Sequence, residues 1–364
     1  MAQDTEDSNA EPTLASLATN AVYIDASVRY SLNFNWDGPV LAALRRLCEA
    51  GVLELKETSI GAREMAVHLR EKVQVAHQAL DKARKLTSIL NQLPNYPDPA
   101  LAPFDQAVAV AQLEANAAAY FAACGAETID LDHVAVSKLM DTYFERRPPF
   151  GDGKKKSEFP DAAVVLALRH WCEANDRKMY VIADDGDLIS ACEPAGPLFH
   201  ASSLEAVVSA ATAQTELVAS IEAALKLRED KILEKIAPKW GYLGFVLDDS
   251  DGDVHHVEAT AVEVGRAYVL SRDDTSFEIE IEADVSFTAQ VSYDDLSTAM
   301  WDSEDKVLYA WNTIEAELAR TTAVRIQLNC EIDTNDVNAL EITWASVTDP
   351  VDVYFSLDEH DDYK

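Results

Sequence analysis

The sequence lacks any run of about 18 consecutive apolar residues, the length that a membrane-spanning helix requires. We therefore expect no transmembrane helix. The N-terminal stretch MAQDTEDSNAEPT is acidic and has no basic start, so it is not expected to act as a secretory signal.

Cysteines at metal-binding or disulfide spacing are also missing. The 364 residues include five cysteines, none in a CxxC pair, and the odd number leaves at least one thiol outside any intramolecular disulfide. A disulfide framework or a thiolate metal site is therefore not expected, and a reducing, cytoplasmic location fits the sequence best.

Glycine-rich phosphate loops are absent too. Neither GxxxxGK[ST] nor GxGxxG occurs, which excludes the common nucleotide-cradling loops. A phosphatase of the haloacid dehalogenase type would need a second aspartate two residues after the first, whereas Asp25 is followed by Ala26 and Ser27.

Positive charge is scarce, with 30 Lys and Arg against 64 Asp and Glu, and the net charge is −34. Such a balance argues against a protein that binds nucleic acid through bulk electrostatics. The imbalance is greatest in residues 241–364, which hold 29 acidic and 6 basic residues. Any surface that binds phosphate is therefore expected in residues 1–240.

What is present indicates a globular chain of two domains, because 48% of the residues are hydrophobic and the length exceeds that of one typical domain. Strands are predicted at 21–24, 52–58, 179–183 and 198–201. Helices are predicted at 36–50, 61–93 with Ser59 as N-cap, 104–124, 132–144, and from Pro160 onward. This alternation is typical of an α/β domain with a parallel sheet, here with a long helical insertion.

The expected order of domains has five parts. They are a tail at 1–18, an α/β domain at 19–211, a bridging helix at 212–238, a smaller acidic domain at 239–357, and a tail at 358–364. The acidic domain is predicted to be rich in antiparallel strands, either α+β or mainly β, because segments such as FEIEIEADVSFTAQVSY alternate apolar and polar residues. One helix, at about 305–319, is expected to interrupt these strands.

Four acidic residues occupy element ends in the first domain. Asp25 follows the first strand, Glu64 and Asp161 begin helices, and Asp185 follows a later strand. A parallel sheet brings the carboxyl ends of its strands to one edge, so these side chains are expected to converge there. Clustered carboxylates repel one another unless cations are bound, and Mg²⁺ and Mn²⁺ prefer such hard oxygen ligands.

The contexts of these acids, VYIDAS, TSIGAREMAVHL, EFPDAAVVLAL and ADDGDL, resemble the motifs of PIN-like nuclease domains over about residues 20–210. The resemblance implies that Asp25, Glu64, Asp161 and Asp185 bind the catalytic Mg²⁺ or Mn²⁺, with Asp187 and Glu158 as further acidic ligands. The loop GDGKKKSEFPDA is similar to that of bacterial PIN-like domains found beside defence genes.

Two assignments have rivals within this pattern. Glu54 and Glu57 are alternatives to Glu64, but they would project from a strand, so Glu64 ranks first. Asp184 is an alternative to Asp185. Each acid also has a purely structural explanation, as a first-turn helix residue or a turn former.

Basic residues lie just before the third acid. Lys154, Lys155 and Lys156, together with Arg146 and Arg147, are predicted to hold substrate phosphates, although a solvated loop would have the same composition. Ala183 replaces the usual Ser or Thr of the fourth family motif.

The resemblance implies a metal-dependent endonuclease that cleaves single-stranded nucleic acid, RNA rather than DNA, in host defence or as a toxin. The competing interpretation is a non-catalytic PIN-like binding or scaffold subunit of a larger defence complex. The acidic C-terminal domain is expected to bind a protein partner, to self-associate, or to restrain the nuclease.

Overall fold

The computed structural model describes residues 17–92, 102–150, 158–192, 196–213, 215–248, 252–273, 275–302, 307–331, 339–350 and 352–357. The chain divides into two compact units after Ala211. The tails predicted at 1–18 and 358–364 fall outside the described residues except for residues 17 and 18, and the lysine loop falls outside them entirely. Within the described part of the chain, every helix is too short or too polar to cross a membrane.

The first unit is built on a five-stranded parallel sheet in the order β3-β2-β1-β4-β5. Its strands are β1 (Ala21–Ile24), β2 (Glu54–Thr58), β3 (Glu127–Ile129), β4 (Met179–Ile182) and β5 (Leu198–Ala201). The central strand β1 is buried along its whole length, as its apolar sequence AVYI requires. The predicted α/β class is confirmed, and β3 is the one strand of this sheet that the pattern did not predict.

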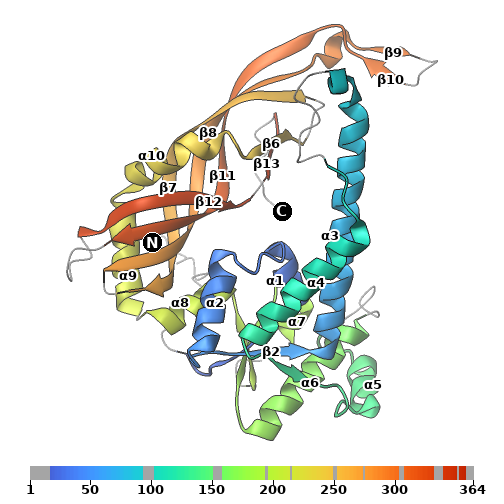
Figure 1. Ribbon diagram of the computed structural model, residues 1–364, viewed down its shortest axis with the longest axis vertical. Coiled ribbons are helices and arrows are strands. Elements are labelled where there is room, and N and C mark those ends of the chain that lie inside the picture. The colour runs from blue at the N-terminus through green and yellow to red at the C-terminus, as the bar shows by residue number, and fades with distance from the viewer. Residues whose placement is uncertain are drawn as a thin grey trace, which may run out of the picture. The chain divides into compact units, whose positions relative to one another are not determined.

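Helices connect these strands (Figure 1). They are α1 (Ala26–Ser31), α2 (Pro39–Glu49), α3 (Ser59–Leu86), the 3₁₀ helix η1 (Ser88–Gln92), α4 (Gln106–Ala123), α5 (Val136–Phe144), α6 (Phe159–Asn175), α7 (Gly186–Ser190) and α8 (Leu204–Thr212). Helices α3 and α4 pack side by side and form the insertion between β2 and β3.

The start of α3 differs from the prediction by one residue. Thr58, not Ser59, is the N-cap, and its hydroxyl oxygen accepts a hydrogen bond from the Gly61 amide at 3.0 Å. The helix ends earlier than predicted, at Leu86, where the chain turns into η1.

Helix α6 is fixed by an apolar face that packs on the sheet. Val164, Leu168 and Trp171 lie at helical spacing and join Tyr23 and Val181 in one buried cluster. Because the rest of α6 is anchored in this way, the position of its first turn relative to the strand ends is also set.

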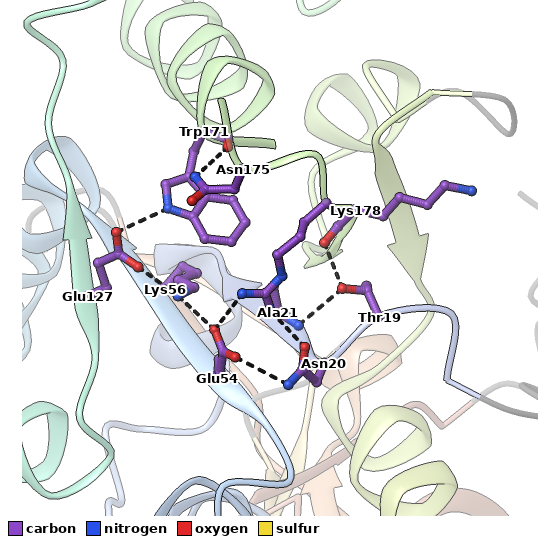
Figure 2. A network of polar contacts seen from close by, with 10 residues as sticks. Thr19, Asn20, Ala21, Glu54, Lys56, Glu127, Trp171, Asn175 and Lys178 are labelled. Carbon is purple, nitrogen blue, oxygen red and sulfur yellow. Dashed lines mark hydrogen bonds and ion pairs between the residues drawn. The ribbon is translucent and has the colours of Figure 1, made fainter. Parts of the chain in front are cut away.

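The amino-terminal edge of the sheet, opposite the strand ends that carry the acids, is held by a polar network (Figure 2). The buried ammonium of Lys56 lies 3.0 Å from Glu54 and 2.7 Å from Glu127, and 4.6 Å from the centre of the Trp171 ring. Arg177 completes the network with an ion pair to Glu54 at 3.0 Å. These contacts tie β2, β3 and α6 together.

The second unit contains a four-stranded antiparallel sheet in the order β12-β11-β8-β7, a parallel pair β13-β6 and a hairpin β9-β10. Its strands are β6 (Gly244–Leu247), β7 (Gly252–Arg272), β8 (Ser276–Asp294), β9 (Met300–Asp302), β10 (Val307–Tyr309), β11 (Thr313–Glu331), β12 (Glu341–Asp349) and β13 (Asp352–Phe355), with the 3₁₀ helix η4 (Leu296–Thr298). This arrangement confirms the prediction of a strand-rich C-terminal region.

The predicted single bridging helix at 212–238 is not observed. These residues form most of two helices, α9 (Thr215–Lys226) and α10 (Glu229–Trp240), and both pack on β7 within the second unit. Their buried residues, Ile221, Leu225, Ile232, Ile236 and Trp240, belong to the core of that unit. Apolar residues at helical spacing indicate a buried face but do not identify the sheet that covers it.

The helix predicted at about 305–319 is wrong. The described part of that range holds β10, a short connection and the start of β11, which pairs with β8 from Thr313 to Glu331. Glu, Ala and Leu in TIEAELAR favour helix locally, but every second residue of β11 faces the same side of the sheet. Pairing along the whole length of β8 overrides the local preference.

A candidate acidic site at the carboxyl edge of the parallel sheet

Asp25 is held rigidly where the central strand ends. Its amide donates to the carbonyl of Ile182 at 2.9 Å, which extends the contact between β1 and β4 by one residue. Its carboxylate caps α1 by accepting from the Ser27 amide at 2.9 Å and from the Ser27 hydroxyl. One carboxylate oxygen is thus engaged in capping, which fixes the direction of the other.

Glu64 lies in the second turn of α3 and is half-buried. Burial raises the pKa of its carboxyl group, and the negative charge of Asp25 raises it further, while His68 and Arg29 act in the opposite direction. Asp25 and Glu64 therefore lie close enough to repel each other, although they are far apart in the sequence.

Asp161 lies in the first turn of α6 and is the most perturbed acid at this edge. Its pKa is raised to about 7, first by burial and then by the charges of Glu64, Asp25, Asp185 and Glu158. Five carboxyl groups from four different segments therefore share one electrostatic environment. The sheet was expected to bring these acids to one edge, and their mutual influence on pKa is compatible with that expectation.

The turn after β4 carries the remaining acids. Asp185 is exposed and contributes to the repulsion at Asp161, whereas Asp184 is not among the charges that act there. The backbone of Asp187 lies in α7, but its side chain is outside the described part of the structure. Asp185 is thus the better placed of the two rivals in this turn.

The rivals of Glu64 are engaged elsewhere. Glu54 belongs to the network at the opposite edge of the sheet. Glu57 is buried and forms an ion pair with Arg29, and its Oε1 also accepts from the Thr58 amide at 2.7 Å. Both project from β2, as predicted, and Glu64 remains the candidate.

Arg29 is a residue that the sequence interpretation missed. It is buried, its Nε donates to the Asp25 carbonyl at 3.3 Å, and its charge acts on Glu64. It therefore connects the segment that carries Asp25 with the strand that precedes Glu64. The signal in the sequence was weak, since it consists of one arginine in the short helix ASVRYS.

Carboxyl groups can lie close enough to repel one another without having the geometry that a metal ion requires. Among the residues that the structure describes, no group of three or more His, Cys, Asp or Glu side chains is close enough to hold a metal ion. The donor set nevertheless fits Mg²⁺ or Mn²⁺, because it consists of carboxylate oxygens whose mutual repulsion a divalent cation would offset. The residues that would hold the ion are Asp25, Glu64, Asp161 and Asp185, with Glu158 beside them.

The predicted phosphate-binding residues are placed only in part. Arg146 and Arg147 are exposed just after α5, and the Nε of Arg147 lies 2.7 Å from a carboxylate oxygen of Glu145. Lys154, Lys155 and Lys156 lie outside the described residues.

Comparison with known proteins gives one positive result. Residues 22–188 match a family model described as the PIN domain. This segment includes all five carboxylates that interact at the sheet edge. No match was found among curated proteins, and none among solved structures.

Proposed function

We propose that this protein is an endonuclease that hydrolyses phosphodiester bonds, because residues 22–188 match a model of the PIN domain, a family of nucleases that are typically metal-dependent. The observation that carries the proposal is the pKa of Asp161, which burial and then the charges of Glu64, Asp25, Asp185 and Glu158 raise to about 7. Carboxyl groups are kept in such an unfavourable arrangement mainly at functional sites.

The protein residues have separate tasks in this proposal. Asp25, fixed by Ser27, presents one oxygen at the centre of the edge, and Glu64 and Asp161 approach it from the starts of two helices. Bound Mg²⁺ or Mn²⁺ would lower the pKa of the attacking water and neutralise negative charge on the phosphate. Arg146, Arg147 and the lysines at 154–156 are proposed to hold flanking phosphates.

The choice of substrate and the biological role rest on the resemblance of the motifs alone. We propose single-stranded RNA as the substrate and host defence, or a toxin-like activity, as the role, in the cytoplasm. The five free thiols are compatible with that reducing compartment. Growth arrest on expression of the wild-type chain, but not of a site variant, is the expected result.

Cleavage is tested with purified full-length protein, Mn²⁺ or Mg²⁺, and labelled single-stranded RNA and DNA. Wild type should cleave RNA faster than DNA, and the double variant Asp25→Asn with Asp161→Asn should lose at least about a hundredfold in rate. Asp176→Asn is a matched control, because Asp176 caps the far end of the helix that carries Asp161. If wild type cleaves neither substrate, or the double variant cleaves equally well, a non-catalytic binding or scaffold role replaces the proposal.

The acidic second unit is proposed to contact a protein partner or a second copy of the chain. Its residues from 241 onward carry 29 acidic and 6 basic side chains, so a basic partner surface is favoured. Sedimentation of the full chain at low and high salt tests self-association, which should weaken as the salt concentration rises.

A further inference from the structure

A groove of about 510 Å³ lies along the face of α6 that is turned toward α5, within the first unit. Helix α6 contributes residues at helical spacing, from Ala162 through Val165 and Arg169 to Glu173. The groove therefore starts one residue after Asp161 and follows the helix for about 16 Å, at 1.5 Å per residue. Its volume is within the range of small-molecule sites.

Cations line this groove even though the chain as a whole is strongly acidic. Lys138 and Arg147 stand on the α5 side and Arg169 on the α6 side, against the acids Asp141 and Glu173. Arg169 donates to the Ala191 carbonyl at 2.8 Å, so it forms part of the wall. Among the residues that the structure describes, Lys138 makes no ion pair, and Arg147 pairs with the exposed Glu145.

Two imidazole rings form a platform in the same groove. The ring centres of His133 and His170 are 4.9 Å apart and their planes are inclined by 31°. Both side chains are exposed, so their outer faces are accessible. Exposed ring faces beside cations suit unpaired bases and their phosphates, because bases stack on flat side chains while the backbone needs positive charge.

We propose that this groove is a nucleotide subsite of the nuclease, which holds the part of a single strand adjacent to the bond at the acidic site. Phosphates lie against Lys138 and Arg147, and a base stacks on the pair His133 and His170. This inference rests on the proposed function, because the groove begins next to Asp161, one of the acids of the proposed catalytic site. An extent of about 16 Å accommodates several nucleotides at roughly 3.4 Å per stacked base, which favours a strand over a free mononucleotide.

The test measures binding without cleavage. Full-length protein in EDTA is titrated with fluorescent single-stranded RNA at several salt concentrations, and anisotropy gives the dissociation constant. Lys138→Ala with Arg147→Ala should weaken binding about tenfold and reduce the slope of log K against log salt by about 0.7 for each lost phosphate contact. His133→Ala with His170→Ala should weaken binding at least about fivefold with little change in the slope.

Matched controls remove the same kinds of side chain elsewhere in the first unit. Arg45→Ala with Lys178→Ala removes two cations away from the groove, and His77→Ala removes an imidazole from α3. These variants should bind the strand as wild type does. Thermal unfolding of every variant establishes that it is folded, and competition with AMP and GMP distinguishes a strand from a free mononucleotide.

Three results would overturn the subsite. They are groove variants that bind the strand as tightly as wild type, wild type that binds no strand at all, and a groove that binds mononucleotides while strand binding is unchanged. The failure of the proposed catalysis looks different. Groove-dependent binding without any cleavage in Mn²⁺ leaves the subsite standing and refutes the endonuclease, whereas cleavage with unaffected groove variants refutes the subsite alone.

Discussion

The guanidinium of Arg29 forms a buried ion pair with the carboxylate of Glu57, with 2% and 7% of the two side chains exposed. Arg29 comes from α1 and Glu57 from β2, so the pair joins the segment that starts at Asp25 to the strand that leads into α3. Such a pair adds little net stability compared with an apolar pair, but the loss of one partner leaves a buried charge.

Arg29→Met should therefore destabilise the protein by about 3–5 kcal/mol, because Glu57 would remain buried without its partner. The double variant Arg29→Met with Glu57→Gln should recover part of that loss. Denaturant unfolding of the two single variants and the double variant gives the coupling energy. Arg45→Met is the control, since it breaks an exposed pair with Asp37 and should cost less than about 1 kcal/mol. Strictly additive effects would contradict the coupling.

Gly61 is required by close packing over this ion pair. A Cβ placed there would lie 2.7 Å from Glu57 Oε1 and 3.1 Å from the Tyr23 hydroxyl oxygen. Gly61→Ala should lower the melting temperature even though alanine favours helix by up to about 1 kcal/mol. Gly186→Ala, in a helix where the added Cβ meets nothing within 4 Å, should leave stability unchanged or raise it slightly. Equal effects at both positions would argue against the close contact.

The raised pKa of Asp161 predicts that stability depends on pH in the absence of divalent ions. Its pKa rises from 3.8 to about 7 on folding, so the folded state binds more protons than the unfolded state between these values. The contribution of Asp161 is thus most favourable below pH 3.8 and is lost as the pH rises through 7. Asp161→Asn should remove this component, which melting curves in EDTA at acidic and mildly alkaline pH would show.

The control and the metal effect follow from the same reasoning. Asp176→Asn should leave the pH profile unchanged, since Asp176 lies at the opposite end of α6. Addition of Mn²⁺ should stabilise wild type more at alkaline than at acidic pH, because protons and cations compete for the same carboxylates. A profile identical in wild type and Asp161→Asn would refute the shared electrostatic environment.

Substitution of Lys56 tests whether stability can be lowered without changing the response of the proposed acidic site to Mn²⁺. Its ammonium is buried between Glu54, Glu127 and the Trp171 ring at the amino-terminal edge of the sheet (Figure 2). Lys56→Met should cost roughly 1.5–3 kcal/mol, the contribution of hydrogen bonds to charged groups. The stabilisation by Mn²⁺ should remain as in wild type, because the acids lie at the other edge. A lost response to Mn²⁺ would show that the two edges are coupled.

The parallel sheet and the position of acids at the ends of its strands could be predicted because short apolar strands, each followed by an acid or a helix start, leave clear local signals. Asp25 after AVYI is one example. Arg29 could not be predicted, since its role depends on β2 lying beside β1, a contact between residues far apart in the sequence.

In the second unit, the sequence predicted the wrong secondary structure or the wrong packing at two places. The segment from Thr313 onward was predicted to be helical because its residues favour helix, while its strand conformation is determined by pairing with β8. Likewise, α9 and α10 have apolar faces that indicate burial, but the sheet that buries them follows them in the chain. Long-range pairing, which a single sequence does not reveal, accounts for both errors.

The strand order has a consequence for synthesis on the ribosome. The central strand β1 hydrogen-bonds β2 on one side and β4 on the other, and β4 is made long after both. At about 5–20 residues per second, β4 follows β1 by roughly ten to thirty seconds. During that interval Asp25 is made but Asp161 and Asp185 are not, so the proposed acidic site stays incomplete until β4 and the turn after it have been made.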